Sequence, residues 1–502
     1  MLSGVINTNI NALYALNSLS NTSNTTNTLE QQLSTGLSIN SPADNPAGYI
    51  AAQGFTAQLG GINQATANSN QAISLVQTAD GAITQQVNIL QNILSIASQA
   101  ANGGATSSQL AALQQVVSQL ETQVSTISQQ TNFNGVNLLD GTFEGVTFQV
   151  GAGAGQTIGL SLGSTAANQI GAYQSSANTG AGIFKTNGVG TGAVADNTGA
   201  SYVIASGGVG LYATGNVGVS GSAGNANFAV SAKNESAQGV AQSINAITSK
   251  TNVTAVADTS VALNVTAGSF SFTLGNGTGA AQTNPVTITA TVTSVSQAGL
   301  AGLANTINEN TGTTGVAATV NSSNQLILTN AQGDNISIAN FSGNGTLAAG
   351  GTTTTTIGTG GGQVQNATIQ GLVTLQSNQS YALAATSSDV GLNTASALSA
   401  VSSVNVSTTA GATAALNVVQ FALQQLENVG GQLGATQQRL QATVSNLQTT
   451  TTNLTAARGV VEDANIPQVS TQLTQQAILQ QAGISALSQS NQLQQAFLKL
   501  LQ

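Results

Sequence analysis

Residues 419–461 read VQFALQQLENVGGQLGATQQRLQATVSNLQTTTTNLTAARGVV, and every seventh residue of this stretch is apolar. The apolar row consists of Val419, Leu426, Leu433, Leu440, Leu447, Leu454 and Val461. A second row lies three residues further on in each heptad and includes Ala422, Val429 and Ala457. Spacings of three and four place both rows on one face of a long helix, in the pattern of a coiled coil. The opposite face is mostly Gln, Asn, Ser and Thr, so we expect other helices of the chain to cover the apolar face.

The composition argues against several classes of function. Only 4% of the 502 residues are charged, against about 25% in ordinary globular proteins. The net charge is −9 and no Lys or Arg precedes Lys185, so the clustered cations that nucleic acid requires are missing and no nucleic-acid partner is expected. The chain has neither Cys nor His, which removes the usual metal ligands and the usual general base. No catalytic residue, metal site or enzymatic activity is therefore predicted.

Export and membrane signals are also missing from the sequence. Residues 1–4 open without the basic segment and the apolar core of a secretory signal peptide. No run of 18 apolar residues occurs, so we expect no membrane insertion.

Both ends of the chain are predicted to be amphipathic helices. Residues 1–33 carry apolar side chains at helical spacing, and Gly36, Pro42 and Pro46 should end this helix in a hinge. Residues 464–502 carry a second apolar stripe. A monomer would expose both stripes, whereas many copies packed head to tail would bury them in a helical filament. The residues predicted to form this self-assembly surface are Ile6, Ile10, Leu13, Leu16, Leu33, Leu473, Ile478, Leu487, Leu493 and Phe497. The alternative is that these are ordinary core helices or a local coiled coil.

The segments next to these ends predict a bundle. One helix should run from about residue 47 to 102 and a third should follow the Gly103-Gly104 pair. With residues 419–461 they would form a bundle of long helices. The predicted bundle core consists of Ile83, Leu90, Leu113, Leu120, Leu433, Leu440, Leu447 and Leu454.

From residue 131 the hydrophobic period changes from helical to alternating. Asn134-Gly135 is a strong turn signal, and Phe133, Asn134 and Gly135 are assigned to a hairpin. Residues 172–387 are rich in Gly, Ser, Thr and Val and predict a β-rich insertion, which we expect to contain two modules. A weak repeat, AQSIN at residues 241–245 and ANTIN at residues 304–308, supports this expectation. Residues 352–356, a run of five threonines between glycines, are interpreted as a loop.

Several stretches of this sequence resemble bacterial flagellin. They are residues 6–9, 33–41 with Asp44 and Ala47-Gly48, 72–74 with 77–82, 131–135, 148–151 and 477–483 with Asn491-Gln492. They occur in the family's order within residues 1–164 and 397–502, and residues 269–343 are similar to β modules inserted in some flagellins.

The resemblance implies a particular fold and function. The fold class is α+β multidomain, with terminal coiled-coil helices, a long-helix bundle and a central β-rich insertion. The function is that of a structural subunit that self-assembles into the extracellular flagellar filament for motility, after type III export without a cleaved signal peptide. The expected domains are residues 1–46 (N-terminal filament-core helix and spoke), 47–171 (bundle helices and hairpin), 172–387 (variable surface insertion), 388–462 (returning bundle helix) and 463–502 (C-terminal filament-core helix).

The resemblance also implies partners and modifications. The partners would be other copies of the chain in a homopolymer, the flagellar export chaperone, and the cap and hook-junction proteins. No cofactor is expected, although family members often carry O-linked glycans on the insertion. The hairpin from residue 133 to 150 is a candidate switching element between packing states of the filament. At the positions that contact the innate-immunity receptor in many flagellins, this chain has Asn92, Ser95 and Val116, so receptor activation is predicted to be weak.

Three alternatives stay open at this point. A hook–filament junction protein would have similar ends. The insertion could act as an adhesin alongside the filament role. The acid pair Glu462-Asp463 could bind a cation, although acids at a helix start also interact favourably with the helix dipole.

The small number of ionisable groups predicts a polymer whose assembly responds little to acid.

Overall fold

The computed structural model of the chain describes residues 9–102, 104–176, 202–205, 215–230, 235–278, 281–321, 323–349, 353–358, 366–385 and 396–500. The chain forms two compact units. Unit 1 comprises Met1–Asp80, Phe143–Ser161 and Gln432–Gln502, and unit 2 comprises Gly81–Thr142 and Leu162–Gly431. The long helices α2 (Pro46–Ala101) and α8 (Thr409–Glu462) each contribute one part to each unit.

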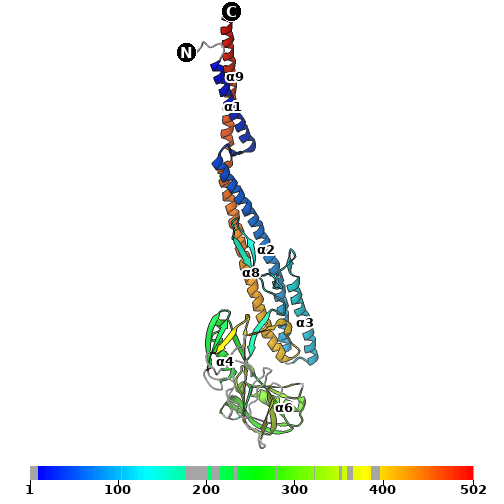
Figure 1. The fold of residues 1–502 in the computed structure, drawn as a ribbon. Helices are drawn as coiled ribbons and strands as arrows, with labels where there is room; N and C mark the ends of the chain where they lie inside the picture. Colours follow the sequence, from blue (N-terminus) through cyan, green and yellow to red (C-terminus); the bar gives the residue numbers. More distant parts are fainter. Residues whose placement is uncertain are drawn as a thin grey trace. The chain divides into compact units, whose positions relative to one another are not determined.

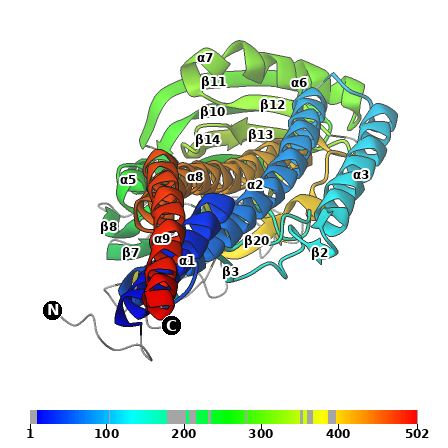
Figure 2. The same cartoon turned by 90° about the horizontal axis from the view of Figure 1, so that it is seen from above.

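Unit 1 is built from pairs of helices. The terminal helices α1 (Ile10–Thr35) and α9 (Ile466–Leu500) lie side by side, as do the α2 and α8 segments of this unit (Figures 1 and 2). The predicted break after the first helix is confirmed. Gly36 ends α1 in the left-handed conformation, with φ +73°, and Pro46 is the first residue of α2, where its missing N–H costs nothing. A hairpin of β3 (Val146–Gln149) and β4 (Thr157–Leu160) completes the unit.

The helical part of unit 2 contains the second part of α2, the first part of α8, and α3 (Ser107–Gln130). Thr106 and Gln109 start α3 with a reciprocal capping box. The predicted Asn134-Gly135 turn is confirmed: it joins β1 (Asn132–Phe133) to β2 (Val136–Asn137), and both turn residues have positive φ, at 52° and 80°. This is the geometry that favours Asn-Gly in two-residue hairpins.

The strands of the rest of unit 2 pair antiparallel wherever the structure describes them. They are β5 (Gly171–Ser176), β6 (Tyr202–Ala205), β7 (Gly215–Gly221), β8 (Gly224–Val230), β9 (Thr254–Val265), β10 (Gly268–Thr278), β11 (Ala281–Val292), β12 (Ala317–Val320), β13 (Leu326–Asn330), β14 (Ile336–Ser342), β15 (Asn344–Ala349), β16 (Thr353–Gly358), β17 (Ala367–Gln370), β18 (Leu372–Ser377), β19 (Ala382–Ala385) and β20 (Ala397–Ala400). One sheet has the order β11-β10-β14-β17-β6, a larger one runs β12-β13-β9-β18-β5-β20 with β15 and β16 off this path, and a third is β19-β7-β8.

Two hydrophobic clusters lie between these sheets and the helices that cover them. One includes Phe272, Leu274 and Phe341 and is covered by α6 (Gln297–Glu309). The other includes Val217 and Phe228 and is covered by α4 (Ala237–Asn245). Short helices α5 (Thr248–Thr251), α7 (Thr311–Thr314) and the 3-10 turn η1 (Val401–Ser403) complete the unit.

The repeat that the sequence suggested is confirmed by matching hydrogen bonds. The Asn245 side chain exchanges two bonds with the backbone of Ala255, at 2.9 and 2.8 Å. The Asn308 side chain exchanges the same two bonds with Ala318, at 2.8 and 2.7 Å. Each Asn therefore fastens the end of its helix, α4 or α6, to the strand that follows.

Two sequence-based assignments differ from the structure. Residues 353–356 are not a loop: they belong to β16, which pairs with β15, because β-branched threonines suit an extended strand; Thr352 lies outside the described residues. The returning helix does not begin near residue 388. It begins at Thr409, after β20 and η1, and the segment from Val404 to Val406 is fixed by the Gln114 side chain of α3.

Candidate self-assembly surface

The seam between α1 and α9 is made mainly of small and polar residues. In α9, the residues from 466 to 493 that are not exposed recur at spacings of four and three, as a coiled coil requires. The seam residues of α1 are Ala12, Ala15, Leu19, Thr22, Thr26 and Leu29, and those of α9 are Val469, Leu473, Gln476, Gln480, Gly483, Leu487 and Ser490. At one end, Asn9 and Ser490 exchange hydrogen bonds of 3.5 and 3.3 Å. Further along, Leu19 fills the space over Gly483.

Many large apolar side chains of these two helices face away from the seam, although Leu19, Leu29, Leu473 and Leu487 lie in it. Leu13 is 56% exposed and Ile478 is 65% exposed. Ile10, Tyr14, Leu16 and Leu33 of α1 and Leu479, Ile484 and Leu493 of α9 are also exposed. A monomer seldom leaves so many large apolar side chains in water on one element. This outer face is therefore a surface that needs a partner.

The structure divides the predicted surface residues between these two faces. Leu473 and Leu487 are half-buried in the seam, whereas Ile10, Leu13, Leu16, Leu33, Ile478 and Leu493 lie on the outer face. Ile6 and the side chain of Phe497 lie outside the described residues. Reasoning from hydrophobicity alone missed the polar members of the seam. Their signal was the three-four spacing of small residues from Ala12 to Thr26.

The connectors that follow α1 and precede α9 are joined to each other. Leu37 and Asp463 form an antiparallel β-bridge, and the Ala464 N–H donates to the Gly36 carbonyl oxygen at 2.8 Å. These contacts use main-chain atoms, so they depend little on side-chain identity.

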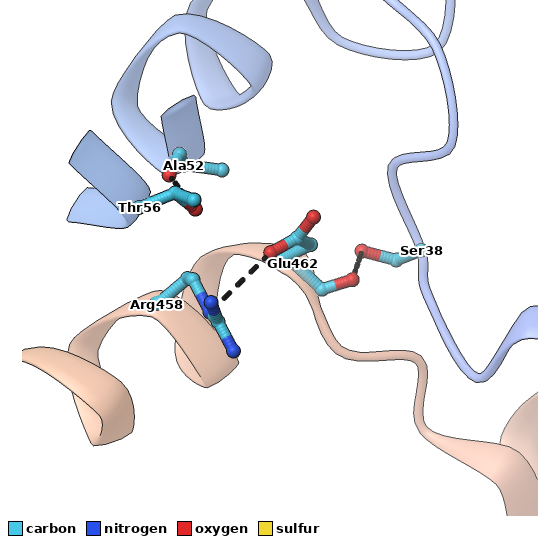
Figure 3. A network of polar contacts seen from close by, with 5 residues as sticks. All are labelled: Ser38, Ala52, Thr56, Arg458 and Glu462. Carbon is cyan, nitrogen blue, oxygen red and sulfur yellow. Dashed lines mark hydrogen bonds and ion pairs between the residues drawn. The ribbon is translucent and has the colours of Figure 1, made fainter. Parts of the chain in front are cut away.

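Side chains reinforce the same joint (Figure 3). The Ser38 N–H and hydroxyl both donate to the Glu462 carbonyl oxygen, at 2.6 and 3.1 Å. The Glu462 carboxylate forms an ion pair with Arg458, which lies one helical turn earlier in α8, at a distance of 3.7 Å between Oε2 and Nε. On the nearby helix α2, the Thr56 hydroxyl donates to the Ala52 carbonyl at 2.9 Å. The acid pair at residues 462–463 thus has structural contacts of its own.

Burial along the heptad row of α8 changes with position. Val419, Leu426, Leu433 and Leu440 are fully buried, whereas Leu447 and Leu454 are only half-buried. On α2, Ile83 and Leu90 are buried. On α3, Leu113 and Leu120 are half-buried, and the buried face is centred on Val117 and Val124 instead.

That buried face of α3 also contains an acid that sequence reasoning did not single out. Glu121 is only 8% exposed, its Oε1 has no hydrogen-bond partner, and burial raises its pKa to about 7. The neighbouring helix α2 contributes Gln86, which is fully buried and donates to the Val124 carbonyl at 2.9 Å. No Lys or Arg occurs in either helix to neutralise the Glu121 carboxylate.

The remaining predicted residues lie at the surface or in the turn. Phe133 is half-buried, and Asn134 and Gly135 are exposed at the turn of the β1–β2 hairpin. Asn92, Ser95 and Val116 are all exposed on α2 and α3. Within the described residues there is no cluster of three or more acids that could hold a metal ion. None of the described helices has the length and apolar character needed to cross a membrane.

Comparisons with known proteins identify the family. Residues 6–144 match the bacterial flagellin N-terminal helical region, and residues 416–501 match the bacterial flagellin C-terminal helical region. The chain is 35% identical over 522 residues to a B-type flagellin of Pseudomonas aeruginosa, covering 99% of both chains. It is 28% identical over 543 residues to flagellin A of Helicobacter pylori, again covering 99% of both. Among solved structures, FliC from Burkholderia pseudomallei is 22% identical, with a TM-score of 0.29 over 73% of this chain and 99% of that one.

This chain belongs to the bacterial flagellin family. It is a subunit of the extracellular flagellar filament that serves motility, and its role is structural rather than enzymatic. The resemblance seen in the sequence is therefore confirmed. Family membership also implies polymerisation into a filament.

Proposed function

We propose that the outer apolar face of α1 and α9 is the surface through which copies of this chain pack in the filament core. The residues assigned to it are Ile10, Leu13, Leu16, Leu33, Ile478 and Leu493, with Ile6 and Phe497 from the sequence pattern, while Leu473 and Leu487 hold the two helices together. The observation that carries the proposal is the number of large apolar residues left exposed on the outside of the coiled coil, while small and polar residues share the seam with a few leucines.

The energetics favour packing between copies. Each large aliphatic side chain gains about 1.5–3 kcal/mol when it leaves water. The seam has no space for these side chains, since it is already filled by residues such as Ala12 and Thr26. Only other chains can cover the outer face without disrupting the α1–α9 pair, and identical neighbours would bring the same face.

The bundle residues extend this arrangement. We assign Ile83, Leu90, Leu433 and Leu440 to the core of the bundle in one subunit, as their burial supports. Leu447 and Leu454 are half-buried, so we assign them to contacts that neighbouring copies complete. Leu113 and Leu120 are half-buried, so we assign them to the edge of the buried face of α3.

The domain division proposed is that of the sequence, residues 1–46, 47–171, 172–387, 388–462 and 463–502, with the helix of the fourth domain beginning only at Thr409. The breaks at residues 36–45 and 463–465 support the two terminal segments. The separate hydrophobic clusters under α4 and α6 support two modules within the insertion. On this division the insertion faces solvent and can carry O-linked glycans.

Further partners follow from the same assignment. The exposed face of the terminal helices would be covered before assembly by an export chaperone, and the ends of the filament would contact cap and hook-junction proteins. Weak activation of the innate-immunity receptor is proposed because Asn92, Ser95 and Val116 are exposed and uncharged. A receptor-reporter cell assay showing signalling as strong as that of a flagellin with charged residues at these positions would contradict it.

The assembly surface is tested by polar substitutions. Leu13→Gln and Ile478→Gln should each raise the critical concentration for seeded elongation about 10- to 100-fold, the loss expected for about 1.5–3 kcal/mol. Val295→Gln is the matched control, because Val295 is an equally exposed apolar residue of the insertion, at 50%. If both coiled-coil variants elongate seeds like the wild type, the assigned surface is wrong.

A further inference from the structure

One sheet of the insertion has a long edge to which no other strand is paired within the described residues. β11 ends the strand order β11-β10-β14-β17-β6, and its 12 residues pair with β10 on one side. The opposite edge of this sheet, β6, and the two end strands of the larger sheet, β12 and β20, have 4 residues each. An unpaired edge presents a row of backbone N–H and C=O groups to another strand, and proteins usually shorten or interrupt such edges. The edge of β11 is therefore an exception that needs an explanation.

Only the first part of β11 is interrupted. Asn284, with a φ of 51°, and Pro285 lie at a break in the register between β11 and β10, and proline has no N–H to offer at an edge. Residues 286–292 then pair with β10 in continuous register, from Val286 opposite Leu274 to Val292 opposite Gly268. This run contains no charged residue. Because the whole chain has few charges, it is the length and regularity of the run that single it out.

The two faces of this run differ. Thr287, Thr289 and Thr291 are exposed on one face. Ile288 and Val292 are buried on the other face, in the hydrophobic cluster covered by α6. A new strand can extend the sheet here only if its side chains alternate in the same way, because a shift of one residue would move every side chain to the wrong face.

The run meets this condition with a copy of itself. Residues 286–292 read VTITATV, which is nearly palindromic. Two copies can therefore lie antiparallel about a two-fold axis at Thr289. The facing pairs are then Val286 with Val292, Thr287 with Thr291, Ile288 with Ala290, and Thr289 with its own copy. Threonine pairs on the exposed face stabilise neighbouring strands, and aliphatic pairs continue the covered face.

We propose that residues 286–292 form a docking edge through which the insertions of two copies of this chain join into one continuous antiparallel sheet. The occupant is a second copy because the palindrome brings the same class of residue to both sides of the axis, which is what a two-fold contact requires. The docking edge lies in the insertion, apart from the apolar face of α1 and α9. The inference therefore goes beyond the proposed packing of the filament core and does not depend on it.

Disulfide cross-linking of the full-length protein tests the register, since the chain has no cysteine of its own. Facing residues of antiparallel strands have Cα atoms about 4.5–5.5 Å apart, which a disulfide can span. With a copper–phenanthroline oxidant, Thr289→Cys should form a covalent dimer alone, whereas Thr287→Cys and Thr291→Cys should do so only when mixed. Thr283→Cys is the matched control, because Thr283 is exposed on the same strand before Pro285.

Three outcomes would overturn the proposal. Thr289→Cys could give no more covalent dimer than Thr283→Cys. Thr287→Cys alone could cross-link as readily as Thr289→Cys, which would mean another register. The mixture of Thr287→Cys and Thr291→Cys could give no more dimer than either variant alone.

Sedimentation equilibrium of the unpolymerised full-length chain provides a second measurement. Thr289→Lys places two like charges directly opposite each other, so it should raise the dissociation constant of the dimer about tenfold or more. Thr283→Lys should leave this constant unchanged, and circular dichroism should show that both variants fold like the wild type. A wild-type chain that stays monomeric at every concentration below polymerisation, or a dimer equally stable in Thr289→Lys, overturns the proposal.

Leu13→Gln separates this contact from the assembly surface of α1 and α9. It should leave the dissociation constant of the dimer at the wild-type value even though it impairs seeded elongation. A dimer that is lost in Leu13→Gln but kept in Thr289→Lys forms through α1 and also overturns the docking edge. Normal elongation by Leu13→Gln with an intact dimer would count against the proposed function alone.

Discussion

The terminal coiled coil leaves many large apolar residues at its surface, whereas the module covered by α6 encloses its own. In the module, Phe270, Phe272 and Phe341 lie inside, with Phe272 and Phe341 stacked at a centroid distance of 5.4 Å. In the coiled coil, Leu13 and Ile478 lie outside. The module can bury its own apolar surface, whereas the coiled coil can do so only with partners. On the proposed assembly, the module is complete in one chain, whereas the coiled coil is completed by neighbouring copies.

The largest effect should come from removing part of the outer face. Deleting residues 478–502 should give a monomer that cannot elongate seeds, because most of the exposed apolar face of α9 is lost. The thermal unfolding of the insertion, followed by calorimetry, should be unchanged. Seed elongation by the truncated chain would refute the proposed dependence on α9.

A core substitution in the insertion should do the reverse. Phe341→Ala should destabilise the module by about 3–5 kcal/mol, since it leaves a cavity against Phe270 and Phe272. Denaturant unfolding measures the loss. Elongation of seeds at low temperature should stay at the wild-type rate, and a block of elongation would show that the insertion takes part in assembly.

The bundle should show a pH dependence that the coiled coil lacks. The folded state raises the pKa of Glu121 from 4.5 to about 7, so it favours the neutral form. Stability from this group is complete below pH 4.5 and declines as the pH rises through 7. Glu121→Gln should therefore stabilise unit 2 by about 2–3 kcal/mol at pH 8 and have no effect in acid.

Denaturant unfolding across this pH range measures the effect, and Glu144→Gln, which alters an exposed acid, is the control. Equal stability of the wild type and Glu121→Gln at pH 8 would show that the carboxylate is solvated in the fold.

The smallest effect is expected at the seam. An added Cβ on Gly483 would lie 3.6 Å from Leu19, which is ordinary packing distance. Gly483→Ala should therefore leave the critical concentration within about twofold and stabilise α9 by up to about 1 kcal/mol. A large rise in critical concentration would mean that position 483 contacts another copy.

The sequence allowed much of the helical architecture to be predicted. Residues that act through local geometry were clear: Gly36 and Pro46 mark the hinge, Asn134-Gly135 marks a turn, and the row from Val419 marks α8. The repeat that ends in Asn245 and Asn308 was visible in the sequence. In the structure, each of these Asn side chains bonds to a strand residue ten positions further along the chain.

What could not be predicted depends on long-range packing. The apolar residues of α1 and α9 follow similar spacings on both faces, so the sequence did not separate Leu19 in the seam from Leu13 outside it. Glycine is required at position 61 because an added Cβ there would lie 2.9 Å from the Cβ of Ala152, which is 91 residues away in the sequence. The burial of Glu121 arises from the rotation of α3 about its axis, which the Leu113–Leu120 pattern does not reveal.

The β-bridge between Leu37 and Asp463 couples the two connectors of a subunit mechanically. Rotation of a filament loads the connectors of each subunit. Two separate linkers would extend one at a time, but main-chain hydrogen bonds that cross between them share the shear. We therefore expect the two connectors to resist extension together rather than singly.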